Sequence, residues 1–145
     1  MPDTLDGRFE LICLHAFLYL HRLKSERPQA SRVCQCFFDR MFADFDRSLR
    51  EMGVGDLSVG KHAKHMAQAF YGRVLSYEAG LAGNNSMLAA ALVRNLFGTV
   101  HPSEAAADGM VAYVRAAVRE LRNQPAAGLL AGHPWWPCSV PKKAP

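Results

Sequence analysis

His62 and His65 are the residues whose type and spacing come closest to a reactive site. Side chains three residues apart share one face of a helix, so this pair could bind a metal ion or haem. The spacing indicates no third ligand, however, and Lys61 and Lys64 beside the histidines would repel a cation. We therefore expect a solvated basic face with no metal and no cofactor. A small haem- or metal-binding regulatory protein that uses His62 and His65 stays the alternative function.

Gly55, Gly60 and Lys61 have the spacing of the first part of a phosphate-binding loop. In that motif Ser or Thr follows the lysine and holds magnesium, whereas His62 follows it here. A predicted helix precedes the segment, where the motif requires a strand. The chain also has no Gly-x-Ser-x-Gly elbow and no Cys–His pairing that spacing can support. The sequence therefore predicts no enzyme, no nucleotide and no small-molecule substrate.

The four cysteines do not form a framework of disulfides or a zinc site. Cys34 and Cys36 are too close for a disulfide and lack C-x-x-C spacing, and Cys138 lies near the C-terminus. Cys13 and Cys34 lie in apolar helical surroundings, which predicts reduced core thiols and a reducing compartment.

Composition places the chain among ordinary globular domains. Its 145 residues suit one domain, with 50% apolar and 21% charged residues. The net charge of +4 and pI near 9.0 are compatible with an anionic partner but demand neither specific nucleic acid nor membrane. The first six residues carry two acids, where a targeting peptide would be basic. No run of 18 uncharged apolar residues occurs, so we expect a soluble, cytoplasmic protein.

Apolar residues recur with helical spacing along most of the chain, and no stretch alternates with the period of a strand. We predict an all-α fold, a single compact domain over residues 1–132 with four to five main helices and short turns. The predicted helices cover residues 4–24, the segment from Pro28 to Met52, 58–82, 86–98 and 103–124, with a short turn at 126–130. Gly53 should end the second of them.

Residues 133–145 should form an irregular tail, because four prolines occur in the last thirteen positions. Trp135 and Trp136 with Lys142 and Lys143 have the composition of a membrane-surface anchor. Alternatively, the tryptophans fold back over apolar surface of the helices.

The connector between the second and third helices, residues 53–61, is unusually apolar for a surface loop. Side chains such as Leu57 must pack on neighbouring helices or contact a partner. We predict an apolar groove between this connector, the third helix from 66 to 77, and the fourth helix near Arg94 and Asn95. Arg73 and Arg94 either rim it or pair structurally with Asp44, Asp46 or Glu78. The predicted client-binding residues are Val54, Asp56, Leu57, Val59, Lys61, Met66, Phe70, Tyr71, Arg73, Tyr77, Arg94 and Asn95.

The order of residues in this region resembles a known family. The segment from Asp46 to Lys61, reading DRSLREMGVGDLSVGK, followed by FYGRV at 70–74 and Tyr77, looks like the signature of the ubiquinol–cytochrome c chaperone family. The segment LAAALVRN at 88–95 resembles the next helix of that family, and AYV at 112–114 resembles a later one. The resemblance covers roughly residues 8–122 and is strongest over 44–98.

The resemblance implies a non-enzymatic assembly chaperone for ubiquinol–cytochrome c reductase, the respiratory complex III. Members bind newly synthesised cytochrome b, protect it and then leave. Mitochondrial members also associate with the ribosome and with a small partner protein. We expect a bacterial, cytoplasmic member that binds cytochrome b, and we keep open contact with the ribosome or a peripheral position at the cytoplasmic face of the inner membrane.

Overall fold

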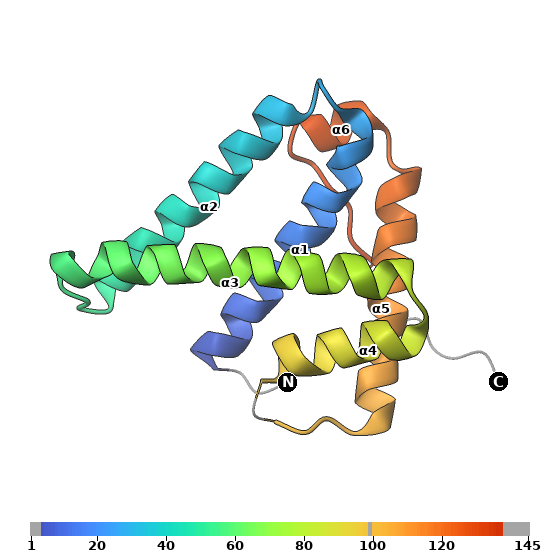
Figure 1. Ribbon diagram of the computed structural model, residues 1–145. Helices are drawn as coiled ribbons and strands as arrows, with labels where there is room; N and C mark the ends of the chain where they lie inside the picture. The colour runs from blue at the N-terminus through green and yellow to red at the C-terminus, as the bar shows by residue number, and fades with distance from the viewer. Residues whose placement is uncertain (1–3, 99, 138–145) are drawn as a thin grey trace.

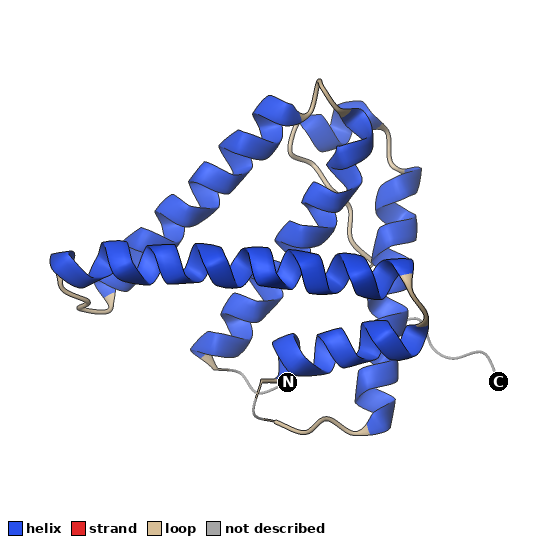
Figure 2. Ribbon diagram, viewed as in Figure 1, coloured by secondary structure: helices blue, strands red, loops and turns tan. Residues whose placement is uncertain are grey.

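The computed structural model describes residues 4–98 and 100–137, and within these ranges it contains helices and loops but no strand (Figures 1 and 2). The all-α prediction is therefore confirmed. The elements are α1 (Leu5–Leu23), a 3₁₀ turn η1 (Lys24–Glu26), α2 (Ser31–Glu51), α3 (Asp56–Ala82), α4 (Asn85–Leu92), a π-helical turn η2 (Val93–Phe97), α5 (Glu104–Asn123) and α6 (Ala126–Leu130).

Local sequence explains where several helices begin and end. The side chains of Thr4, Asn84 and Ser103 each accept a hydrogen bond from the backbone N–H three residues on, which caps α1, α4 and α5. After α2 the chain turns at Gly53, whose φ of 85° is a conformation that side chains disfavour. The predicted fourth helix is α4 only as far as Leu92, because the chain continues to Phe97 as a wider π turn.

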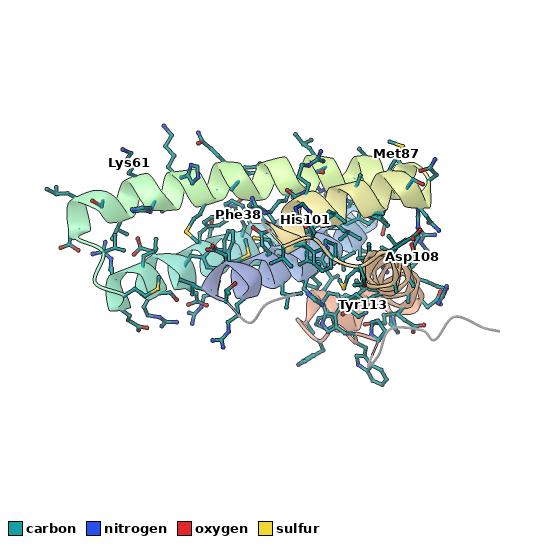
Figure 3. The ribbon with its side chains drawn as sticks, turned by 90° about the horizontal axis from the view of Figure 1, so that it is seen from below. Phe38, Lys61, Met87, His101, Asp108 and Tyr113 are labelled. Carbon is teal, nitrogen blue, oxygen red and sulfur yellow. The ribbon has the colours of Figure 1, made fainter. Side chains whose placement is uncertain are left out.

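The helices form two layers. Figure 3 shows α3 and α4 side by side in one layer, with α1, α2 and α5 beneath them. With 27 residues, α3 is about 40 Å long and crosses α1 near its middle, while the α2–α3 hairpin extends away from the other helices (Figure 1). This arrangement leaves one broad side of α3 without a packing partner along most of its length.

The buried side chains gather in two clusters. The larger joins α1, α3, α4, α5 and α6 and includes Phe17, Tyr77 and Leu92. The smaller lies where α1, α2 and α3 meet, and it is rich in aromatic residues: Cys13, Ala16, Met41, Phe45 and Phe70, with Phe9, Phe37, Phe38, Phe42 and Met66 packed against them.

The C-terminal segment folds back onto the helices in its described part. Trp136 packs against the larger cluster with its ring edge on His15, at a centroid distance of 4.9 Å. Trp135 is exposed, although its backbone is held by hydrogen bonds from and to the side chain of Gln124. Lys142 and Lys143 lie outside the described residues.

Two glycines of α3 should respond to alanine in opposite directions. A Cβ at Gly80 would lie 3.0 Å from Cα of Leu88, so α4 would have to move, whereas a Cβ at Gly72 would meet nothing within 4 Å. We expect Gly80→Ala to lower the free energy of unfolding by about 1–2 kcal/mol through overpacking. Gly72→Ala should raise it by up to about 1 kcal/mol, because glycine disfavours helix interiors. Urea denaturation of both variants measures this, and equal effects would contradict the close α3–α4 packing.

Candidate functional site

A groove lies between α1, α2 and α3, with a volume of about 450 Å³. One helix contributes each wall, because α2 and α3 diverge from their hairpin and α1 forms the third side of the triangle (Figure 1). We call it the aromatic groove, and its lining consists of Phe17, Leu20, His21, Lys24, Arg27, Ser31, Cys34, Gln35, Phe38, Phe70, Tyr71, Val74 and Glu78.

Three aromatic rings form the apolar end of this groove. The ring of Phe38 lies 5.7 Å from that of Tyr71 and 6.1 Å from that of Phe70, centroid to centroid. Phe70 is buried, Phe38 is half-buried, and Tyr71 is 56% exposed at the rim. The apolar end thus has a fixed floor and an accessible wall, so it can accept an apolar side chain of a partner without the groove having to unfold.

The opposite end of the groove is charged. The carboxylate of Glu78 is bound by Lys24 and by Nδ1 of His21, the latter at 3.0 Å. Burial alone would raise the pKa of Glu78, but the hydrogen bonds from Lys24 and His21 lower that pKa below its usual value. The groove therefore offers an apolar surface that ends in a fixed polar group.

Arg73 has a structural partner that the sequence analysis did not foresee. Its guanidinium makes two hydrogen bonds to the carboxylate of Glu10, including Nε to Oε2 at 2.5 Å, and Nη1 donates to the carbonyl of Ala69 at 2.9 Å. Both side chains of the pair are mostly buried, with exposures of 18% and 11%. The predicted structural partners Asp44, Asp46 and Glu78 were therefore wrong for Arg73, which ties α3 to α1.

This ion pair lies among other buried polar groups. The hydroxyl of Tyr77 is buried without a hydrogen-bond partner among the described residues. Burial, together with the charge of Glu10, raises the pKa of the Cys13 thiol to about 12, although Arg73 opposes the shift. Cys13 is therefore a protonated core thiol at neutral pH, whereas Cys36 is exposed.

The predicted client-binding residues of the connector and early α3 do not share one face. Leu57 is fully exposed at the tip of the hairpin, Lys61 is exposed, and Asp56 pairs with Arg50. Val59, by contrast, is 1% exposed, and Val54 is half-buried. The connector residues therefore do not form a wall of the aromatic groove.

The remaining predicted residues divide between core and surface. Phe70 and Tyr77 are buried, and Met66 packs on the smaller cluster, so in this conformation Phe70 and Tyr77 have almost no surface to offer a partner. Arg94 is exposed and donates to the hydroxyl of Ser76 at 2.8 Å, and Asn95 donates to the carbonyl of Ala91 at 2.9 Å. Of the twelve predicted residues, Phe70 and Tyr71 line the aromatic groove.

Sequence reasoning missed the α1 and α2 walls of the groove. Phe38 and Leu20 lie there, but Phe38 falls beside the apolar stripe of α2, so helical spacing alone gave it no role. The available signal was the surplus of aromatic residues in α2, which exceeds what one buried stripe needs.

A second groove of about 460 Å³ opens on a different face of α1 and α2. Its walls include Ile12, Met41 and the Trp136 ring, and Arg40 pairs with Asp44 beside it. None of the twelve predicted residues lines this groove. Ile12, at 48% exposure, is its most accessible apolar side chain, which makes it a useful reference position.

In the ranges 4–98 and 100–137, no three His, Cys, Asp or Glu side chains gather where they could hold a metal ion. No helix in these ranges combines the length and apolar character needed to cross a bilayer. The helical fold and the aromatic groove are typical of a helical binding protein.

Comparison with known proteins identifies the class more narrowly. The family model described as ubiquinol-cytochrome C chaperone matches residues 1–136. The chain therefore belongs to the ubiquinol–cytochrome c chaperone family, whose members are chaperones and assembly factors of complex III and are not enzymes.

Three relatives show how far the similarity extends. Ubiquinol-cytochrome-c reductase complex assembly factor 1 of Xenopus laevis is 29% identical over 145 residues, which cover 99% of this chain and 72% of the frog protein. The Mus musculus protein is 30% identical over 130 residues, or 90% of this chain, but this match spans only 44% of the mouse protein. The crystal structure of the Cbp3 homolog from Brucella abortus is 42% identical, with a TM-score of 0.81, covering 93% of this chain and 75% of that one.

Proposed function

We propose that this protein is a non-enzymatic chaperone that binds newly synthesised cytochrome b in the aromatic groove and promotes assembly of ubiquinol–cytochrome c reductase. The names of its relatives support a role in that assembly. The observation that carries the choice of site is the cluster of Phe38, Phe70 and Tyr71, an aromatic surface in which Phe70 and Tyr71 belong to the segment that resembles the family signature.

The groove suits an apolar helix of a membrane protein. Aromatic side chains provide large contact areas with little loss of conformational freedom, and an apolar helix face can lie against Phe38 and Tyr71. At the other end, His21, Lys24 and Glu78 offer hydrogen bonds to a polar segment that flanks such a helix. Cytochrome b consists largely of membrane-spanning helices with polar flanks, so it presents both kinds of surface before assembly.

The proposed cycle requires no nucleotide. A client leaves when the other subunits of the complex bind it more tightly than the chaperone does, because binding to a competing partner depletes the free client. On this proposal the chaperone acts in stoichiometric amounts and close to a membrane.

Recovery of freshly made cytochrome b tests the proposed function. Cytochrome b is synthesised in a cell-free system with the tagged chaperone, beside a second polytopic membrane protein of similar hydropathy. We expect cytochrome b to be retained with the chaperone in preference to the second protein. Equal retention of both would show general affinity for apolar chains, and retention of neither would refute the proposed client.

A further inference from the structure

The charges of this chain are unevenly distributed. From Leu57 to Ser103 the sequence contains four cationic residues, Lys61, Lys64, Arg73 and Arg94, but a single acid, Glu78. This segment thus carries three of the four net positive charges of the chain. The acid does not neutralise the outer side of the layer, because Glu78 is held in the aromatic groove by Lys24 and His21.

Three of these cationic residues, Lys61, Lys64 and Arg94, share one face with exposed apolar side chains, whereas Arg73 is buried against Glu10. Residues 57, 61, 64, 68 and 75 follow the spacing of a single helical stripe, and Leu57 and Leu75 on it are 101% and 72% exposed. Figure 3 shows Lys61 of α3 and Met87 of α4 pointing to the same side, away from the second layer. We call this surface, formed by Leu57, Lys61, Lys64, Gln68, Leu75, Met87 and Arg94, the outer face of the α3–α4 layer.

We infer that the outer face binds the surface of an anionic lipid bilayer. Two antiparallel helices present it as a broad surface, on which α3 alone extends about 40 Å. A peripheral protein gains affinity by burying apolar side chains at the boundary of headgroups and acyl chains while lysine and arginine contact anionic headgroups. The buried apolar side chains would be Leu57, Leu75 and Met87. The contacts to anionic headgroups would come from Lys61, Lys64 and Arg94.

The mixture of side chains favours lipid over nucleic acid. Contacts to the phosphates of a nucleic acid would explain the cationic side chains. They would leave three apolar side chains, which are 51–101% exposed, without a role. Long lysine side chains can lie along apolar surface and extend their ammonium groups to the headgroups, which accommodates Lys61 and Lys64 between Leu57 and Leu75. Asp56 beside Leu57 pairs with Arg50, so it adds little net repulsion at the tip.

The outer face adjoins the aromatic groove without being part of it. Tyr71, at the rim of the groove, lies on the flank of α3 between the two surfaces. A chaperone that lies on the bilayer with this face would hold the groove beside the membrane. The inference does not require cytochrome b to be the client, because lipid binding is measured without any client.

Co-sedimentation with vesicles tests the inference. The full chain should bind vesicles that contain phosphatidylglycerol and phosphatidylcholine, bind phosphatidylcholine alone far less, and dissociate as the salt concentration rises. Since each lysine near an anionic surface contributes about 1 kcal/mol, Lys61→Gln with Lys64→Gln should weaken partitioning about 30-fold. Leu57→Ser with Leu75→Ser should weaken it while leaving the charge unchanged.

The matched control removes the same number of positive charges from α5. Arg119 and Arg122 are exposed on α5, so Arg119→Gln with Arg122→Gln lowers the net charge equally but should alter partitioning by less than about twofold. An equal loss in both double variants would overturn the outer face as the binding surface. Absence of vesicle binding, or binding of polyuridylate instead with the same dependence on Lys61 and Lys64, would overturn the lipid assignment.

Discussion

Replacement of Arg73 by methionine is expected to lower the free energy of unfolding by about 3 kcal/mol. The substitution leaves the carboxylate of Glu10 at the crossing of α1 and α3, where the side chain is 11% exposed and has lost its bidentate partner. Removing one member of a buried ion pair costs about 3–5 kcal/mol, and the residual exposure places this pair at the lower end. For a chain of this length the melting temperature should fall by about 10 °C.

A double-mutant cycle separates the energetic contribution of this ion pair from that of the packing of the Arg73 side chain. Glu10→Gln with Arg73→Met removes both charges, so the double variant should be more stable than Arg73→Met alone. If Arg73→Met melts within about 2 °C of the unchanged chain, Arg73 is not the structural tie described above, and a direct role in client contact would regain support.

Replacement of Tyr71 by aspartate should abolish most client binding while leaving the fold intact. The side chain is 56% exposed, so the substitution buries no charge in the free protein, yet it places a carboxylate against the bound apolar segment. A partner that covers this carboxylate must desolvate it without a counter-ion, which costs several kcal/mol. We expect the recovery of newly made cytochrome b to fall at least about tenfold, since 1.4 kcal/mol already suffices for that loss.

Ile12→Asp is the matched control for this variant. Ile12 is 48% exposed and lines the second groove, so the same chemical change is made at a similar exposure on another face. Circular dichroism should show unchanged folding for both variants. Loss of client binding in Ile12→Asp, with full binding in Tyr71→Asp, would place the client in the second groove and contradict the proposed site.

The helices were predictable because their signals are local. The apolar stripes predicted the fold class and Gly53 predicted the turn after α2, and the structure contains both. The caps at Asn84 and Ser103 are equally local features. Each of these signals depends on residues within one or two helical turns of each other. The π turn after Leu92 has no comparable local signature, so a simple helix to Gly98 was predicted instead.

The site was less predictable because it depends on how helices cross. Leu57 and Val59 are two residues apart in the same apolar connector, yet Leu57 is fully exposed and Val59 is 1% exposed. Nothing in that segment indicates which face of α3 meets α1. Likewise, Arg73 finds Glu10 sixty-three positions away, a pairing that spacing along one helix does not contain.

The family signature and the aromatic groove share two residues. Phe70 and Tyr71 belong to the segment that resembles the family, and both line the aromatic groove. Their partner Phe38 lies outside that signature, on α2, so only the packed structure brings the three rings together. Phe70 is the floor of the groove, which leaves Tyr71 as the position where a probe can reach a client.

Site-specific photo-crosslinking tests the central claim most directly. A photoreactive amino acid is placed at Tyr71 in one protein and at Ile12 in another, and each protein is irradiated during synthesis of cytochrome b. We expect a cytochrome b adduct from position 71 and little or none from position 12. An adduct from position 12 alone, or none from either protein while cytochrome b co-purifies with both, would contradict binding in the aromatic groove.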